Sequence, residues 1–274
     1  MSSSTWRLIL DPPAAGPWNM AVDEALLEAA GTGKAPTTLR LYAWDPACLS
    51  LGFAQPAADV DLPALAENGW QLVRRPTGGR AILHTDELTY AVIGPAGEPL
   101  LTGTVLESYA RLSQALLAAL NRLGLPARAD RDHPSSSPPS SNGPVCFEVP
   151  SHYEITANGK KLIGSAQARR AGGVLQHGTL PLTGDLARIT RALHFPDENL
   201  RRVAAQRVLE RAVTADTVLG RTPSWQEAAS AFIQAFQETF DLTLTSGELS
   251  AGERRRAGEL LEEKFAAGEW TFRV

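Results

Sequence analysis

Cysteine is scarce in this chain of 274 residues, which contains only Cys48 and Cys146. Two cysteines cannot form a disulfide framework, and no cluster of cysteine and histidine has the spacing of a zinc site. Residues 1–10 lack a basic segment followed by a long apolar run, so we expect no signal peptide. No apolar run is long enough to cross a bilayer. We therefore expect a cytoplasmic protein with reduced thiols, no metal and no membrane partner.

Positive charge is also in deficit, because 26 Lys and Arg stand against 30 Asp and Glu and give a net charge of −4. A general nucleic-acid binder usually carries a positive surface, so we expect no nucleic-acid partner. There is no P-loop either. Hydrophobic residues make up 43% of the chain. That is enough for one large core, so we expect a single domain over residues 1–274.

A double glycine stands in the middle of segment 74–90, RRPTGGRAILHTDELTY. Gly78 and Gly79 permit positive φ and carry no Cβ, so backbone N–H groups there can come close to a ligand. Arginine suits a carboxylate or phosphate ligand. The arginines beside the glycines are Arg74, Arg75 and Arg80. The alternative is an ordinary β-hairpin with charged flanks.

Hydrophobic patterning predicts mostly strands in the first two thirds of the chain. We expect them over 6–10, 38–44, 48–53, 71–75, 80–84, 88–93, 153–157, 160–168 and 173–182. Several of them follow one another without a helix between them, so part of the sheet should be antiparallel. Asn158-Gly159 is the strongest hairpin signal.

Helices are predicted mainly from their N-terminal caps. One should run from Met20 to Ala30, capped by Asn19, with Asp23 and Glu24 in its first turn. The other cap signals are Asp61 and the capping boxes that begin at Thr104, Ser224 and Ser250. Residues from about 185 to 274 should be largely helical. Segment 132–144 is rich in Ser and Pro, so we expect a mobile loop that acts as a linker or as a lid.

Cys146 follows this loop directly, in the sequence PVCFEVP. A thiol must be a thiolate to act as a nucleophile, and a nearby cation lowers its pKa. The candidate cation is Lys161, in NGKKLIGSAQ. Side chains alternate along a strand, so only one of Lys160 and Lys161 should face a site.

Each candidate also has an ordinary structural interpretation. Cys146 can be a small buried residue, and Lys161 can be a surface lysine. Cys48 fits a buried structural cysteine, because its apolar strand contains no cation or base. His84 and His177 are candidate bases, although lone histidines are usually hydrogen-bonded structural residues.

Several motifs, in their order along the chain, resemble the lipoate/biotin protein ligase catalytic-domain superfamily. The resemblance is closer to its octanoyltransferase branch and covers nearly the whole chain. It is carried by segments 19–27 (NMAVDEALL), 74–90, 145–148 (VCFE), 151–154 (SHYE) and 159–167 (GKKLIGSAQ). The resemblance implies an α/β (α+β) fold with mixed, largely antiparallel sheets, one larger and one smaller, flanked by helices.

The resemblance also implies an activity and a set of site residues. The enzyme would move an octanoyl group from octanoyl-acyl carrier protein to a lysine of a lipoyl-accepting protein, the glycine cleavage H protein. Cys146 matches the acyl-thioester nucleophile, and Lys161 matches the lysine that lowers its pKa. The matches to the acyl pocket are Arg75, Gly78, Gly79, His84, Gly164, Ser165 and Ala166. The family often has His-Asp where this chain has His84-Thr85-Asp86, which leaves the role of Asp86 open.

No cofactor is expected for this reaction, because exchange between thioesters is nearly neutral in free energy and amide formation is downhill. Three alternatives remain open. The first is an ATP-dependent lipoate–protein ligase, which needs no cysteine nucleophile. The second is an amidotransferase that moves octanoyl between lipoyl domains. The third is a binding module without catalysis.

Overall fold

The computed structural model describes residues 4–130 and 154–274. The expected mobile loop at 132–144 and Cys146 lie outside those residues. In the described part of the chain, no helix combines the length and the apolar character of a membrane span.

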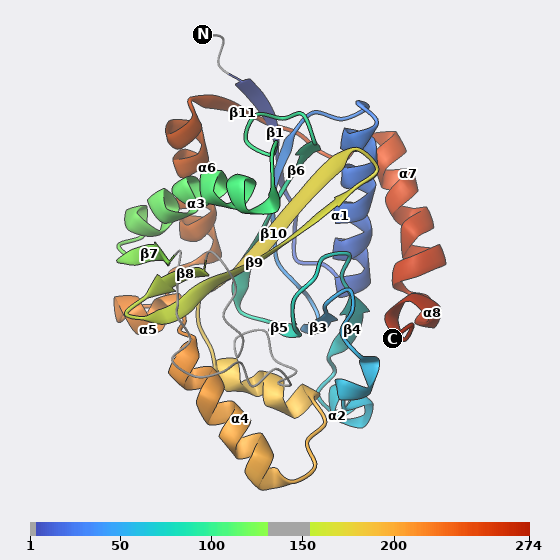
Figure 1. Ribbon diagram of the computed structural model, residues 1–274, viewed down its shortest axis with the longest axis vertical. Coiled ribbons are helices and arrows are strands. Elements are labelled where there is room, and N and C mark those ends of the chain that lie inside the picture. Colours follow the sequence, from blue (N-terminus) through green and yellow to red (C-terminus); the bar gives the residue numbers. More distant parts are fainter. Residues whose placement is uncertain (1–3, 131–153) are drawn as a thin grey trace.

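The largest element is an eight-stranded sheet with the strand order β11-β1-β2-β6-β10-β9-β8-β7 (Figure 1). Its strands are β1 (Ser4–Leu10), β2 (Thr38–Tyr42), β6 (Glu87–Pro95), β7 (Ala127–Asp130), β8 (Glu154–Ala157), β9 (Lys160–Arg170), β10 (Gly173–Pro181) and β11 (Leu242–Ser246). Strand β1 is parallel to both β2 and β11, and every other pair is antiparallel. The prediction of a mixed, largely antiparallel sheet is confirmed.

A second, three-stranded sheet has the order β4-β3-β5, and its strands are β3 (Cys48–Leu51), β4 (Gln71–Arg74) and β5 (Ile82–His84). It packs through its own apolar cluster against short helical segments. The nearby helical segments are η1 (Ala57–Asp59), α2 (Leu62–Glu67), η3 (Leu186–Ala192) and α4 (Glu198–Arg211). The expected smaller sheet is therefore present.

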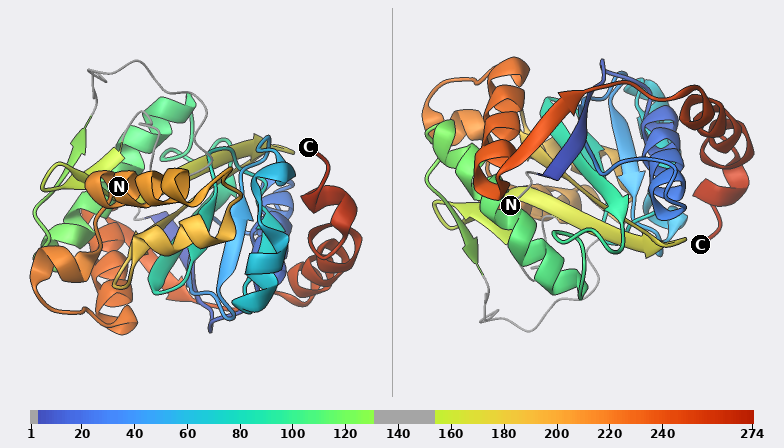
Figure 2. Two further views of the ribbon diagram at one scale, coloured as in Figure 1. Left: turned by 90° about the horizontal axis from the view of Figure 1, so that it is seen from below. Right: turned by 90° about the horizontal axis from the view of Figure 1, so that it is seen from above.

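Helices cover both faces of the large sheet, as the two views in Figure 2 show. Helices α3 (Val105–Arg122) and α6 (Trp225–Phe240) lie on one face, and α1 (Gly16–Gly31) and α7 (Ala251–Leu260) lie on the other. Central strand β6 is buried on both faces, so its residues are almost all apolar. Its Tyr90 packs toward α6, whereas its Ala91 packs with the cluster of α1. The remaining helical segments are α5 (Ala215–Leu219), η4 (Leu261–Phe265) and α8 (Gly268–Thr271).

The local turn and cap signals were accurate. All three capping boxes form with reciprocal hydrogen bonds, at Thr104, Ser224 and Ser250. Asp61 caps α2 through Ala64 N–H. Asn158 and Gly159 both have positive φ in the hairpin between β8 and β9. These signals succeed because they depend on residues that are neighbours in the sequence.

The prediction for the first helix was wrong at its start. Helix α1 begins at Gly16, where Pro17 supplies a favourable φ in the first turn. Asn19 lies inside the helix, and its side-chain amide donates to the carbonyls of Ala14 and Ala43 instead of capping. Asp23 is fully buried rather than placed at the helix end.

The C-terminal part was predicted as helical, but it also contains strand β11. Asp241 ends helix α6 with a left-handed backbone conformation, and Leu242 to Ser246 then pair with β1. This strand has no local signal in the sequence, because its partner lies more than 200 residues away along the chain.

Candidate active site

A narrow cavity, which we call the inner cavity, lies between the small sheet and strands β9 and β10. Apolar side chains of Tyr42, Trp44 and Ile82 form part of its wall. Most of the predicted binding residues line the same cavity: Arg75, Gly79, His84, Gly164, Ser165 and Ala166. The structure thus brings the two sequence blocks, 74–90 and 159–167, to opposite sides of one space.

A second, more open cleft continues from the inner cavity, and the two share Gly79 and Ser165. We call it the arginine cleft, since its lining includes Arg80, Arg169 and Arg170. Gly78 and Lys161 also line this cleft rather than the inner cavity. Lys161 and every residue matched to the acyl pocket therefore lie at one of these two connected spaces.

Arg75 shapes the glycine turn from within. Its guanidinium donates to the carbonyls of Ser50 (3.0 Å), Gly78 (2.8 Å) and Arg80 (2.8 Å). The turn also lies so close to β3 that an added Cβ on Gly52 would be 1.9 Å from the Gly79 carbonyl oxygen. These contacts hold the turn in one conformation, with Gly79 at a φ of +93°.

Arg74 does not face a ligand, although its neighbourhood suggested a group of arginines around the turn. Its side chain is fully buried. The guanidinium donates to the main-chain carbonyls of Thr271 (2.7 Å), Gln55 (2.6 Å) and Gly52 (2.8 Å). Arg74 therefore joins the small sheet to the C-terminal helix α8.

His84 is held on three sides. Its Nε2 lies 2.8 Å from Ser50 Oγ, and its Nδ1 lies 2.6 Å from Glu87 Oε1. The ring stacks on Trp44 with 3.8 Å between ring centroids. Both ring nitrogens are engaged, so His84 forms a rigid wall of the inner cavity.

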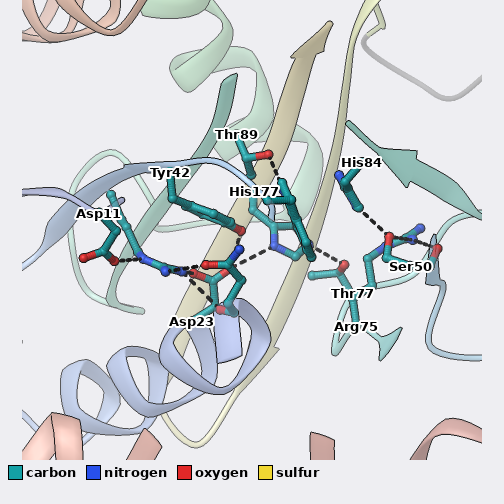
Figure 3. A network of polar contacts seen from close by, with 12 residues as sticks. Asp11, Asp23, Tyr42, Ser50, Arg75, Thr77, His84, Thr89 and His177 are labelled. Atoms are coloured by element: carbon teal, nitrogen blue, oxygen red, sulfur yellow. Dashed lines mark hydrogen bonds and ion pairs between the residues drawn. The ribbon is translucent and has the colours of Figure 1, made fainter. Parts of the chain in front are cut away.

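His177 has a matching arrangement on the other side of the cavity (Figure 3). Its Nε2 lies 2.7 Å from Thr77 Oγ1, and its Nδ1 lies 3.1 Å from Asp23 Oδ2. Burial lowers the pKa of His177, while Asp23 acts in the opposite direction. The cavity is therefore bordered by two chains of hydroxyl, imidazole and carboxylate, whose partners the sequence analysis did not predict.

Asp23 is the buried centre of a charged network. Arg40 Nη1 donates to its Oδ1 at 2.7 Å, and the hydroxyl of Tyr42 donates to its Oδ2 at 3.0 Å. Burial alone would raise the pKa of Asp23, but Arg40 and His177 hold it below the ordinary value. The only sequence signal for this role was an acidic residue inside an otherwise apolar helical segment.

Lys161 is 5% exposed, and its Nζ lies 2.9 Å from Glu154 Oε1. Lys160 points the other way and donates to the carbonyl of Leu209 on α4. The alternation expected from the sequence therefore leaves Lys161 at the cleft. Its distance from Cys146 stays a prediction, because Cys146 lies outside the described residues.

The remaining candidates have structural roles. Cys48 is fully buried, and burial raises the pKa of its thiol far above the ordinary value, with a further contribution from Glu87. Asp86 is exposed and pairs with Arg188 at 2.5 Å, away from the inner cavity. Across residues 4–130 and 154–274, no group of three or more His, Cys, Asp or Glu side chains is arranged to hold a metal.

Comparisons with known proteins agree with this arrangement. Residues 16–237 match the family described as Lipoyl protein ligase A/B catalytic domain. A curated relative named Octanoyltransferase LipM, from Symbiobacterium thermophilum, is 41% identical over 278 residues and covers 98% of this chain and 99% of its own. Another with that name, from Moorella thermoacetica, is 41% identical over 98% of both chains.

Solved structures show the same fold. The structure of a bipartite lipoate protein ligase and its E2 lipoyl domain from Thermoplasma acidophilum superposes with a TM-score of 0.82. It is 26% identical and covers 98% of this chain and 96% of that one. The chain therefore belongs to the lipoyl protein ligase A/B catalytic domain family and, within it, to the octanoyltransferases.

Proposed function

We propose that this octanoyltransferase takes its acyl group from octanoyl-acyl carrier protein and passes it to a lysine of a lipoyl domain, such as that of the glycine cleavage H protein. We further propose that the group is held on Cys146 as a thioester between the two steps. The observation that carries the proposal is the inner cavity, whose wall is partly apolar and which shares Gly79 and Ser165 with the cleft that contains Lys161.

The apolar part of the cavity wall suits an acyl chain. Burial of the octanoyl chain contributes roughly 0.8 kcal/mol per methylene, which sums to several kcal/mol. The acyl carbon would then lie at the junction of the cavity and the cleft. This position places it beside the Gly79 backbone and within reach of the strand that carries Lys161.

The proposed chemistry has two steps. The Cys146 thiolate attacks the donor carbonyl, and the carrier thiol leaves and takes up a proton. The neutral amine of the acceptor lysine then attacks the acyl-cysteine, loses a proton and displaces the thiolate. In this proposal the Lys161 ammonium and the backbone N–H of the glycine turn stabilise the negative oxygen in both steps.

We also propose that the described chain acts as one catalytic unit. Strand β11 from the C-terminal part completes the large sheet beside β1, and Arg74 at the glycine turn bonds to Thr271. The C-terminal elements therefore support the same site rather than a separate one.

The test is an intact-mass measurement after incubation with octanoyl-acyl carrier protein and no ATP. We expect one octanoyl adduct on the wild type and on Cys48→Ala, and none on Cys146→Ala. Transfer that requires ATP and survives Cys146→Ala would instead establish the lipoate–protein ligase alternative. An octanoylated lipoyl domain offered as donor, in place of the carrier protein, tests the amidotransferase alternative.

A further inference from the structure

The arginine cleft is lined by basic residues, whereas the chain as a whole has a negative net charge. Its described lining contains Arg80, Arg169 and Arg170, and also Lys161, whose ammonium is paired with Glu154; the lining itself contains no Asp or Glu. The chain as a whole has 26 basic and 30 acidic residues. Cations concentrated in a cleft without acidic lining raise the local concentration of an anionic ligand.

Two of these arginines are held in place by neutral groups. Arg170 donates to the Pro76 carbonyl at 2.8 Å, and its guanidinium lies 5.6 Å from the Phe53 ring. Arg169 donates to the Leu101 carbonyl and to Ser108 Oγ. Neither has a carboxylate partner within the described residues, so their positive charge is fixed in direction but is not neutralised there.

The glycine turn lies at the inner end of this cleft, at its junction with the inner cavity. An acyl carbon at the junction would therefore lie beside the turn. Arg169 and Arg170 lie further along strand β9, at its far end, where they could meet a group remote from the acyl carbon. Arginine forks provide charge-assisted hydrogen bonds that match phosphate oxygens.

We propose that the arginine cleft binds the phosphate group of the acyl donor, which is the phosphodiester at the far end of the pantetheine arm. This inference rests on the proposed function, since it takes the donor to be a carrier-protein thioester. Gly79 and Ser165 line both the inner cavity and the arginine cleft, so they mark the junction of the two spaces. An acyl chain in the inner cavity places its thioester at the junction, so the arm must leave through the cleft.

The experiment compares two donors that differ only in one phosphate, octanoyl-pantetheine and octanoyl-4′-phosphopantetheine. We expect the wild type to have a kcat/KM about tenfold higher or more for the phosphorylated donor, the effect of one charge-assisted contact. The ratio of the two kcat/KM values should fall to about twofold in the double variant Arg80→Gln/Arg170→Gln. Arg170→Lys should have a ratio between those of the double variant and the wild type. The control Arg255→Gln, an exposed arginine on α7, should keep the wild-type ratio.

A ratio near one in the wild type, or an unchanged ratio in the double variant, would overturn the inference. The ratio cancels any general loss of activity, and circular dichroism melting checks that each variant is folded. If neither donor transfers octanoyl, the proposed function fails. In that case, calorimetric titration with 4′-phosphopantetheine and with AMP tests the phosphate site independently of octanoyl transfer. Arginine-dependent binding of phosphopantetheine supports the phosphate site, and binding of AMP alone assigns the cleft to a nucleotide and overturns the inference.

Discussion

Nζ of Lys161 lies 2.9 Å from Oε1 of Glu154, and the two residues are only 5% and 8% exposed. Glu154 begins strand β8 and Lys161 is the second residue of strand β9, so a tight hairpin fixes their distance. A buried ammonium held by one carboxylate stays in one place. We infer that Glu154 is the positioning residue for the amine proposed to act on Cys146.

Removal of this amine should make Cys146 less reactive. In Lys161→Ala we expect the pKa of the Cys146 thiol to rise, because a nearby positive charge favours the thiolate. Alkylation by iodoacetamide near neutral pH should then slow by about tenfold, which corresponds to one pKa unit. The matched control is Lys160→Ala, whose side chain points to α4. Equal alkylation rates in both variants and the wild type would contradict the assignment.

Substitution of Asp23 should change how stability depends on pH. Its pKa is lower in the folded chain than its ordinary value of 3.8. Its contribution to the free energy of unfolding is therefore present above that value and is lost as the pH falls below it. Asp23→Asn should lower the free energy of unfolding at neutral pH by about 3 kcal/mol, since Arg40 and His177 lose a buried charge partner.

Urea denaturation between pH 3 and pH 7 measures this effect, and the variant should lose less stability than the wild type as the pH falls below 3.8. Asp86→Asn is the control, because Asp86 is exposed and forms its ion pair with Arg188 at the surface. The pKa of His177 is also lowered in the folded chain, so both proteins lose stability as the pH falls below 6.5. This loss should be larger in Asp23→Asn, because Asp23 raises the pKa of His177. A loss below pH 3.8 that is as large in Asp23→Asn as in the wild type would refute the proposed pairing.

Replacement of Thr179 by an apolar residue of the same shape should stabilise the protein. Its Oγ1 is buried at the inner cavity and has no hydrogen-bond partner in the described part of the chain. Because an unsatisfied buried hydroxyl is costly, Thr179→Val should raise the free energy of unfolding by about 1 kcal/mol. The contrast is Thr89→Val, since Thr89 donates to Glu87 and accepts from Trp44. Chemical denaturation should show opposite signs for the two variants.

A methyl group on Gly52 should displace the glycine turn. The added Cβ would lie 1.9 Å from the Gly79 carbonyl oxygen, so backbone must move. We expect Gly52→Ala to lower octanoyl transfer by at least about tenfold, because a displacement of roughly 1 Å at a site costs about that much or more. Gly97→Ala is the control, since no atom lies within 4 Å of its added Cβ. Normal transfer by Gly52→Ala would show that the turn tolerates this movement.

The sequence predicted those features that depend on near neighbours. Capping boxes, the Asn158-Gly159 hairpin and the alternation of Lys160 and Lys161 all follow from local geometry. The fold class and the gathering of the blocks 74–90 and 159–167 followed from the resemblance, since periodicity alone does not say which strands pair.

What the sequence did not reveal depends on long-range contacts. Asp23 was expected at a helix end, but its partners Arg40 and His177 come from β2 and β10. Strand β11 was missed because its pairing partner is β1. Arg74 was expected to face a ligand, yet it bonds to a carbonyl 197 residues further along. In each case the deciding partner is distant in sequence and has no local signature.

The bond between Arg74 and the Thr271 carbonyl has a consequence for biosynthesis. During translation, the glycine turn emerges from the ribosome long before residue 271 is added. Until then the Arg74 guanidinium lacks the acceptor that it has in the finished fold. The catalytic centre of this enzyme should therefore mature only after residue 271 has been synthesised.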